Sequence, residues 1–288
     1  MRVLITGAAG YIGQQLLNQL AIQHPQWTLI AADIRPQSRA GLKLNIEPVL
    51  LDISNSAAVA SCVATWQPQA IVHLASVVTP PPGMSEEQLH AIDVGGTQSL
   101  IQAAAAHGVE QLIVTSSGAA YGYDPQNAEW LDEDQPLRGH AQFAYAKHKR
   151  EVEVLLAEAR TQHPHLKQLV LRPGTILGKQ VNNQITELFK KPSVLGIRGS
   201  DSRFVFIWDQ DVVDIICRGL RQQSAGIFNL AGDGALSLKE IAELLGKPYR
   251  PLPAWLISAA LRVLKPLGLS PYGPEQVDFL RYRPVLSN

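Results

Sequence analysis

Short apolar runs and amphipathic stretches alternate over roughly the first 170 residues of the chain. The apolar runs lack polar alternation, which is typical of strands covered on both faces of a sheet. They are Val3–Thr6, Thr28–Ala32, Val49–Leu51, Ala70–Leu74, Gln111–Thr115 and Gln168–Leu171. Helical patterns fill the gaps, at Ile12–Gln23, Ala57–Trp66, Glu86–His107 and Phe143–Gln162. This alternation predicts an α/β fold with a doubly wound parallel sheet.

The alternation breaks after Arg172-Pro173-Gly174, where glycine and proline become frequent. Later elements are more scattered: strands at Phe204–Trp208 and Ile227–Leu230, and helices at Val212–Arg221, Leu238–Leu245 and Trp255–Leu264. The last helix contains Arg262 and is too short to span a bilayer. The pattern predicts a large domain over residues 1–172 and a smaller one over 173–288, some of whose segments can return to the first.

Three glycines stand between the first strand and the first helix. Gly7, Gly10 and Gly13 follow the order strand, turn, helix, which in a Rossmann-type sheet presents backbone N–H groups to a pyrophosphate. A Cβ at such positions would keep the phosphate away from the main chain. Spacing alone leaves a flexible turn as the alternative.

Asp33 ends the second strand, twenty residues after Gly13. A carboxylate at this place accepts the ribose hydroxyls of an adenosine and repels a 2′-phosphate, which favours NAD over NADP. Arg35 softens this preference because a guanidinium accommodates the phosphate. A loop carboxylate or a helix cap is the alternative interpretation of Asp33.

Tyr145 and Lys149 lie four residues apart in a helical pattern and therefore share one helix face. A nearby ammonium lowers the pKa of a phenol, so Tyr145 can accept a proton from a substrate hydroxyl. Ser117 follows the fifth strand, at the edge where such sheets place ligands, and can hydrogen-bond the substrate oxygen. Taken singly, the pair could be solvated helix surface and the serine a turn former.

Composition excludes several other classes of protein. The 288 residues are 46% hydrophobic, and 25 basic side chains balance 25 acidic ones, which removes the electrostatic case for a nucleic-acid binder. Two distant cysteines, Cys62 and Cys217, and the absence of a secretory pattern fit a reduced cytoplasmic setting. The eight histidines have no metal-ligand spacing, so we expect no metal. The most apolar stretch, Trp255–Leu264, is too short to span a bilayer, so we expect no membrane partner.

Together these motifs resemble the extended short-chain dehydrogenase/reductase family, the NAD-dependent epimerase/dehydratase group. The matching positions are Thr6-Gly7-Ala8-Ala9-Gly10-Tyr11-Ile12-Gly13, Asp33, Asp52-Ile53, His73-Leu74-Ala75-Ser76, Ser116-Ser117 with Tyr121-Gly122, Tyr145 to Lys149, Arg172-Pro173-Gly174, and Phe228-Asn229-Leu230 before Gly232-Asp233.

The resemblance implies roles for these residues. Ser117, Tyr145 and Lys149 would be catalytic. Tyr145 and Lys149 would also contact the cofactor, with Lys149 holding the nicotinamide ribose. Asp52 and Ile53 would lie beside the adenine, and Leu74, Ala75 and Ser76 along the cofactor. The glycine segment, with Tyr11 and Ile12, would bind NAD. Residues 1–172 would be the NAD-binding domain and 173–288 the substrate-binding region. A homodimer through the helices Glu86–His107 and Phe143–Gln162 is also implied.

Departures from the family pattern narrow the activity. Asp93 stands where the family has an asparagine, and Trp208 where many members have histidine. Gly118 and Ala119 replace the acidic pair of the sugar dehydratases, which argues against that reaction. The family's diphosphate-binding asparagine has no counterpart in the stretch from Arg172 to Thr175, although Arg203 can meet a diphosphate. The family also usually runs longer than Asn288.

We therefore expect an NAD-dependent epimerase or oxidoreductase that acts on a secondary alcohol of a sugar-like substrate, with nucleotide-sugars as one class. Thr79 is a candidate for one wall of the substrate pocket. A dehydrogenase or reductase of an apolar alcohol or ketone, steroid- or flavonoid-like, is the first alternative. A non-catalytic dinucleotide sensor is the second, and the Tyr145–Lys149 pair argues against it.

Overall fold

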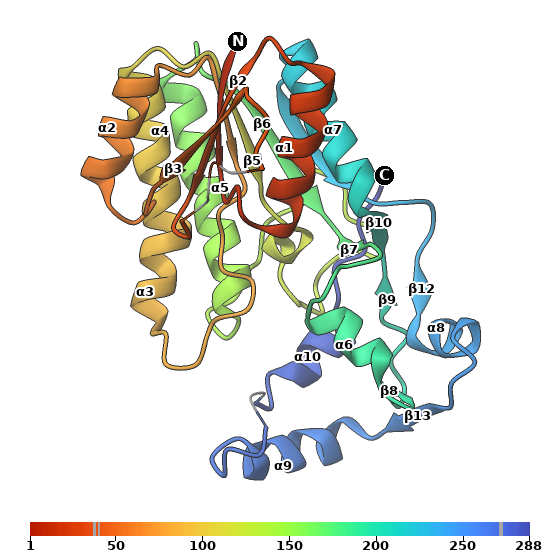
Figure 1. Ribbon diagram of the computed structural model, residues 1–288. Coiled ribbons are helices and arrows are strands. Elements are labelled where there is room, and N and C mark those ends of the chain that lie inside the picture. Colours follow the sequence, from red (N-terminus) through yellow and green to blue (C-terminus); the bar gives the residue numbers. More distant parts are fainter. Residues whose placement is uncertain (37–38, 40, 271–272) are drawn as a thin grey trace. The chain divides into compact units, whose positions relative to one another are not determined.

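Seven strands form the main sheet within the described residues, which in this computed structural model are 1–36, 39, 41–270 and 273–288 (Figure 1). In chain order they are β1 (Arg2–Thr6), β2 (Thr28–Asp33), β3 (Ile46–Leu50), β4 (Ala70–His73), β5 (Gln111–Thr115), β6 (Lys167–Pro173) and β11 (Gly226–Leu230). Their spatial order is β11-β6-β5-β4-β1-β2-β3, and the neighbours from β6 to β3 pair in parallel. The order reverses direction between β1 and β4, so the predicted Rossmann-type doubly wound sheet is confirmed.

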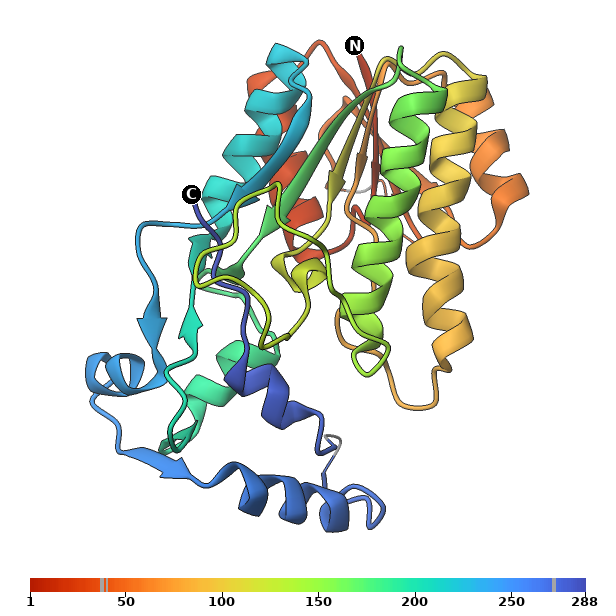
Figure 2. The same ribbon diagram turned by 180° about the vertical axis from the view of Figure 1, so that it is seen from behind.

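Helices cover both faces of this sheet. On one face lie α1 (Tyr11–Gln23) and α7 (Asp209–Gln222), and on the other α2 (Ser56–Trp66), α4 (Gly96–Ala106) and α5 (Ala144–Gln162) (Figures 1 and 2). The second face holds a core of completely buried side chains, among them Leu4, Val59, Ile71, Leu100, Leu112 and Leu156. Each contributes about 1.5–3 kcal/mol by leaving water.

Two predicted elements differ from the structure. The helix expected over Glu86–His107 is α3 (Glu86–His90) and α4 joined by a π-helical turn at Ala91–Gly95. The strand expected over Phe204–Trp208 is two short strands, Arg203–Phe204 and Phe206–Trp208, because the chain changes its pairing partner at Val205. The strand predicted at Ile227–Leu230 is present as part of β11, and it is one of the later segments that return to the main sheet.

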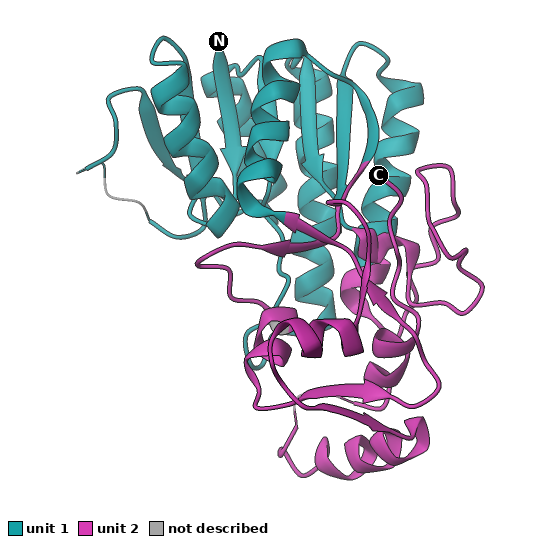
Figure 3. Ribbon diagram, turned by 90° about the vertical axis from the view of Figure 1, so that its right-hand side faces the viewer, with its two compact units in different colours: residues 1–117, 148–172, 208–228 teal, residues 118–147, 173–207, 229–288 magenta. Residues whose placement is uncertain are grey.

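The chain divides into two compact units, coloured separately in Figure 3. Unit 1 comprises residues 1–117, 148–172 and 208–228, and unit 2 comprises 118–147, 173–207 and 229–288. The chain thus crosses between the units several times, because α7 and most of α5 are needed to cover the sheet.

Unit 2 is built from short elements around small apolar clusters. Its strands pair two by two: β7 (Thr175–Leu177) with β10 (Phe206–Trp208), β9 (Arg203–Phe204) with β12 (Leu236–Ser237), and β8 (Val194–Ile197) with β13 (Tyr249–Leu252). Its helices are α6 (Gln184–Lys190), α8 (Leu238–Leu244), α9 (Ala254–Leu264) and α10 (Gln276–Arg281), and a 3₁₀ turn covers Gly118–Tyr121. Ser237 opens α8 with the predicted capping box.

Among the helices that the structure describes, none combines the length and the apolar character that a membrane span requires.

Candidate functional site

The glycine-rich turn after β1 is closed tightly against the end of β4. Gly7 has φ +71°, and a Cβ there would lie 2.7 Å from the backbone nitrogen of Ala75. A Cβ on Gly13 would collide with the carbonyl of Gly7, to which the N–H of Gly10 donates at 2.9 Å. These close approaches explain the glycines, and they bring the predicted cofactor residues Gly7, Gly10, Gly13 and Ala75 together.

Asp33 lies at the end of β2 beside this turn and is 7% exposed. Its Oδ2 accepts the N–H of Ala9 at 2.9 Å, and its Oδ1 accepts the N–H and the Nε of Arg35 at 2.9 and 3.2 Å. Arg35 remains largely exposed. The carboxylate is thus fixed by the turn that is predicted to hold the pyrophosphate.

Tyr11 anchors the start of α1 to α7. Its hydroxyl donates to Oδ2 of Asp209 at 2.5 Å, and Nε2 of Gln15 donates to the same oxygen at 3.1 Å. Burial raises the pKa of Asp209, but the hydrogen bonds from Tyr11 and Gln15 outweigh it and lower that pKa overall. Sequence reasoning did not single out Asp209, because its partner lies 198 residues away.

The other predicted cofactor residues follow β3 and β4. Asp52 is exposed and accepts the N–H and hydroxyl of Ser54 at 2.9 and 2.7 Å. Ile53 is buried against Gly96, where a Cβ would come within 2.8 Å of it. The Oγ of Ser76 is buried and has no hydrogen-bond partner among the described residues, whereas Thr79 is exposed. Leu74 and Ile12 are half-buried.

Helix α5 carries both residues of the predicted Tyr–Lys pair, one turn apart. Lys149 is 6% exposed, and its Nζ donates to the carbonyl of Thr115 at 3.0 Å, at the end of β5. Ser117 follows two residues later and is half-buried, as is Tyr145. Burial lowers the pKa of Lys149, while the negative charges of Asp93 and Glu153 oppose that effect.

A buried ion pair fixes α5 to the carboxyl ends of β5 and β6. Arg172 bonds Glu153 through Nε at 2.9 and 3.0 Å and through Nη2 at 2.5 Å, with both side chains 4% exposed. The hydroxyl of Ser116 donates to the same carboxylate at 2.6 Å. This network orients the helix that bears Lys149.

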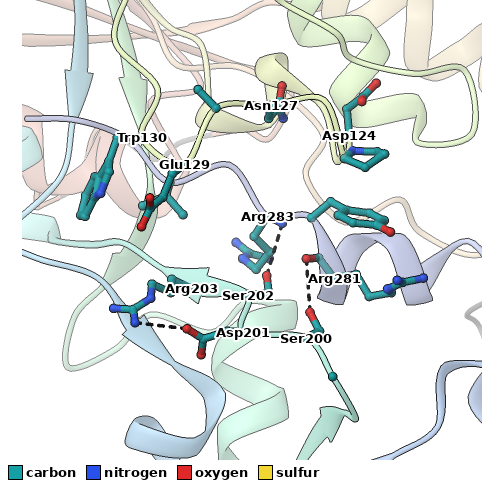
Figure 4. Close-up of a pocket in the computed structure, with 15 residues that line it drawn as sticks. Asp124, Asn127, Glu129, Trp130, Ser200, Asp201, Ser202, Arg203, Arg281 and Arg283 are labelled. Carbon is teal, nitrogen blue, oxygen red and sulfur yellow. Dashed lines mark hydrogen bonds and ion pairs between the residues drawn. The ribbon is translucent and has the colours of Figure 1, made fainter.

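Unit 2 contains a pocket of about 400 Å³ with charged walls (Figure 4). Its basic lining residues are Arg203, Arg281 and Arg283, and its acidic ones are Asp124, Glu129 and Asp201. Arg203 pairs with Asp201 at 3.1 Å, and the guanidinium of Arg283 stacks on Phe204, 4.1 Å from the ring centre.

Two of the three guanidinium nitrogens of Arg283, which lines this pocket, have no hydrogen-bond acceptor among the described residues. Its Nη2 donates to Thr175 at 3.3 Å, whereas its Nε and Nη1 are buried and find no partner within the described chain. Burial lowers the pKa of Arg283, and Tyr123 opposes this. Among the pocket's arginines, the sequence prediction named Arg203 alone, since Arg281 and Arg283 belong to no motif.

A parallel sheet with a glycine cradle, a carboxylate at the end of β2 and a buried lysine at the end of β5 defines a dinucleotide-binding α/β protein. Residues 3–231 match the model of the NAD-dependent epimerase/dehydratase family, and the chain belongs to that family. The predicted resemblance is confirmed, and NAD is the cofactor of this class.

Known relatives extend the likeness over most of the chain. The 3-diazoavenalumate denitrifying reductase of a Streptomyces species is 30% identical over 277 residues, with 89% of this chain and 86% of the relative covered. The UDP-Glc/GlcNAc 4-epimerase of Campylobacter jejuni superposes with a TM-score of 0.71 at 22% identity, covering 88% and 86% of the two chains. MoeE5 in complex with UDP-glucuronic acid and NAD gives 0.69 at 25% identity, with the same coverage.

Proposed function

We propose that the protein is an NAD-dependent epimerase or oxidoreductase of a secondary alcohol on a sugar-like, nucleotide-linked substrate. The observation that carries this proposal is the placement of Lys149. Its buried ammonium is fixed on the carbonyl of Thr115, two residues from Ser117 and one helical turn from Tyr145.

In the proposed reaction Tyr145 takes the proton of the substrate hydroxyl as the carbon is oxidised. The Lys149 ammonium favours the phenolate, and the Ser117 hydroxyl donates to the substrate oxygen as that oxygen becomes a carbonyl. When bound, NAD would accept the hydride that leaves the carbon of the substrate alcohol. Gly7, Gly10, Gly13, Tyr11, Ile12 and Asp33 would hold the NAD, with Asp52, Ile53, Leu74, Ala75 and Ser76 alongside.

The glycine turn fits such a group. A Cβ is sterically excluded at Gly7 and Gly13, so no side chain covers the backbone of the turn at these two positions. The turn leads directly into the start of α1, where the free N–H groups of a helix attract phosphate. The buried, unpartnered Oγ of Ser76 after β4 adds a hydroxyl that a cofactor can satisfy within the described structure.

The pocket in unit 2 supports a substrate with an anionic portion. Arg203 and Arg283 line it, and Arg283 offers two buried N–H-bearing nitrogens that a phosphate oxygen would satisfy. The structural neighbour MoeE5 is known in complex with UDP-glucuronic acid and NAD. A keto product that stays and is reduced from its other face gives an epimer, whereas one that leaves makes the protein a dehydrogenase.

A reductase of an apolar ketone is the second candidate. Helix α9 leaves Trp255 71% and Val263 59% exposed, and the Streptomyces relative is named a reductase. Thr79 stays a proposed wall of the substrate site in both cases. A homodimer and a cytoplasmic location also remain predictions.

The two candidates separate in one experiment. The purified protein is incubated with NAD and a panel of UDP- and dTDP-hexoses, and in parallel with NADH and a panel of steroid- and flavonoid-like ketones. Products are followed by NMR together with NADH absorbance. Conversion of a sugar nucleotide supports the first candidate. Reduction of apolar ketones by NADH, with no sugar nucleotide converted, overturns it in favour of the second.

A further inference from the structure

Asp93 is a buried carboxylate at the irregular point of a helix. It lies in the π-helical turn Ala91–Gly95, and it is 3% exposed. Its Oδ1 accepts the N–H of Val77 at 3.1 Å, and its Oδ2 lies 3.4 Å from Nδ1 of His148. A buried carboxylate is costly unless it is paired, and π-turns of this kind occur often at functional sites.

The partner histidine precedes Lys149 directly in α5. The side chains of His148 and Asp93 are 1% and 2% exposed, so water contributes little to either. Two carboxylates, Asp93 and Glu153, favour the charged form of Lys149. Glu153 forms an ion pair with the guanidinium of Arg172. Asp93 instead interacts with the backbone N–H of Val77 and the imidazole of His148.

The groups around His148 connect this pair to the surface. The ring of His90, from α3, meets the His148 ring edge-on with centroids 5.3 Å apart, and Nε2 of His90 bonds Glu151 at 2.9 Å. His90 is 47% exposed. The buried His73, in β4, also interacts with this group, because the positive charge of Lys149 contributes to lowering the pKa of His73. Asp93 thus faces a histidine that is itself buried, whereas the next histidine of the cluster, His90, reaches the surface.

We infer that Asp93, oriented by His148, is a positioning residue that keeps the buried Lys149 in its ammonium form. The inference rests on the proposed function, because the Lys149 charge serves the phenolate of Tyr145. An asparagine, which the resembled family carries at this place, has the same shape but no charge. By docking Val77, Asp93 also ties the loop after β4 to the helix that precedes α4.

The test compares Asp93→Asn with the native protein by two readouts. Lysine labelled with ¹³C at Cε gives the Lys149 pKa by NMR titration, with the signal assigned from its loss in Lys149→Gln. We expect Asp93→Asn to lower this pKa by about one unit or more, since an adjacent opposite charge is worth about 1–3 units. The alkaline limb of the kcat–pH profile should move to lower pH by the same amount. Glu158→Gln, an exposed charge removal on α5, is the control and should move neither.

An unchanged Lys149 pKa in folded Asp93→Asn overturns the inference, and a uniform loss of kcat without a shifted limb assigns Asp93 a merely structural role. The NMR titration needs no turnover, so an inactive native protein contradicts the proposed function without touching this result. His148 is tested separately. His148→Gln keeps an N–H donor and should preserve the Lys149 pKa, whereas His148→Leu should lower it. Equal pKa values in the two variants would remove His148 from the proposal, and this pair also covers failure of Asp93→Asn to fold.

Discussion

The Oδ2 of Asp33 accepts the backbone N–H of Ala9 at 2.9 Å, so the carboxylate predicted to bind ribose also holds the glycine-rich turn. The two roles predict different effects for different substitutions. Asp33→Asn keeps an oxygen for Ala9 but loses the charge that repels a 2′-phosphate. Asp33→Ala loses both.

Asp33→Asn should therefore weaken NAD binding while leaving or improving NADP binding, and Asp33→Ala should weaken both, NAD more. A hydrogen bond to a charged group is worth about 1.5–3 kcal/mol, which is roughly a tenfold to hundredfold change in Kd. Isothermal titration of each variant with both cofactors measures this. Asp214→Asn, an exposed carboxylate on α7, is the control. Equal losses for NAD and NADP in Asp33→Asn would contradict the ribose role.

Gly7 and Gly108 form a matched pair for testing the cradle. Both have positive φ, +71° and +69°, but a Cβ on Gly108 meets open space whereas one on Gly7 meets the backbone of Ala75. Gly108→Ala should cost about 1–2 kcal/mol of unfolding free energy from the left-handed conformation alone. Gly7→Ala should cost more and should also abolish NAD binding, which urea unfolding and titration with NAD would show. Similar losses in both variants would mean that the close approach is unimportant.

The sheet could be predicted because strands that are buried on both faces have uninterrupted apolar sequences. Gln111–Thr115 matches β5 at both ends, and Thr28–Ala32 differs from β2 by one residue. The break at Ala91–Gly95 was not predictable, since a π-turn keeps the apolar periodicity of its flanking helices. The return of β11 to the main sheet depends on long-range pairing that a local pattern does not contain.

The site divides in the same way. Motif residues such as Gly7, Asp33 and Lys149 can be predicted from their spacing and from their positions relative to strands. The residues that hold these motif residues in place cannot be predicted in this way. Asp209 and Glu153 act through partners that are distant in sequence, and nothing local distinguishes them from other acidic side chains on helices.

Tyr145→Phe removes the hydroxyl that the proposed mechanism needs and little else. Loss of general acid–base catalysis should lower kcat by about 10²–10⁴-fold. The Kd for NAD should stay nearly constant, because all but one of the predicted cofactor residues are unchanged and the phenyl ring of Tyr145 is kept. Steady-state kinetics together with NAD titration give both numbers. Unchanged turnover in this variant would refute the mechanism.

The Glu153–Arg172 pair predicts a large effect on stability. Glu153→Gln leaves Arg172 buried without its counter-charge and should cost about 3–5 kcal/mol of unfolding free energy. Glu187→Gln breaks an exposed pair with Lys190 and should cost under about 1 kcal/mol. Urea denaturation of both variants makes the comparison. A small loss for Glu153→Gln would show that Ser116 and neighbouring groups already satisfy Arg172.

His73 predicts how stability depends on pH. Its ring is 3% exposed, with Nδ1 2.7 Å from the Thr6 hydroxyl and Nε2 3.0 Å from the Thr97 hydroxyl. Burial, with a smaller contribution from the Lys149 charge, lowers the pKa of His73 from 6.5 to about 3. The imidazole is therefore neutral in the fold between these values but protonated in the unfolded chain.

Because the unfolded state then binds a proton that the native state does not, stability rises with pH across this window. The contribution of His73 is fully present above pH 6.5 and is lost as the pH falls from 6.5 towards 3. Urea unfolding of the native protein and of His73→Gln at several pH values isolates it. Their difference should change by at most about 1.4 kcal/mol per pH unit below 6.5 and be flat above. His107→Gln, at an exposed position, should follow the native protein throughout. A pH-independent difference for His73→Gln would mean that His73 takes up a proton in the folded state as readily as in the unfolded one.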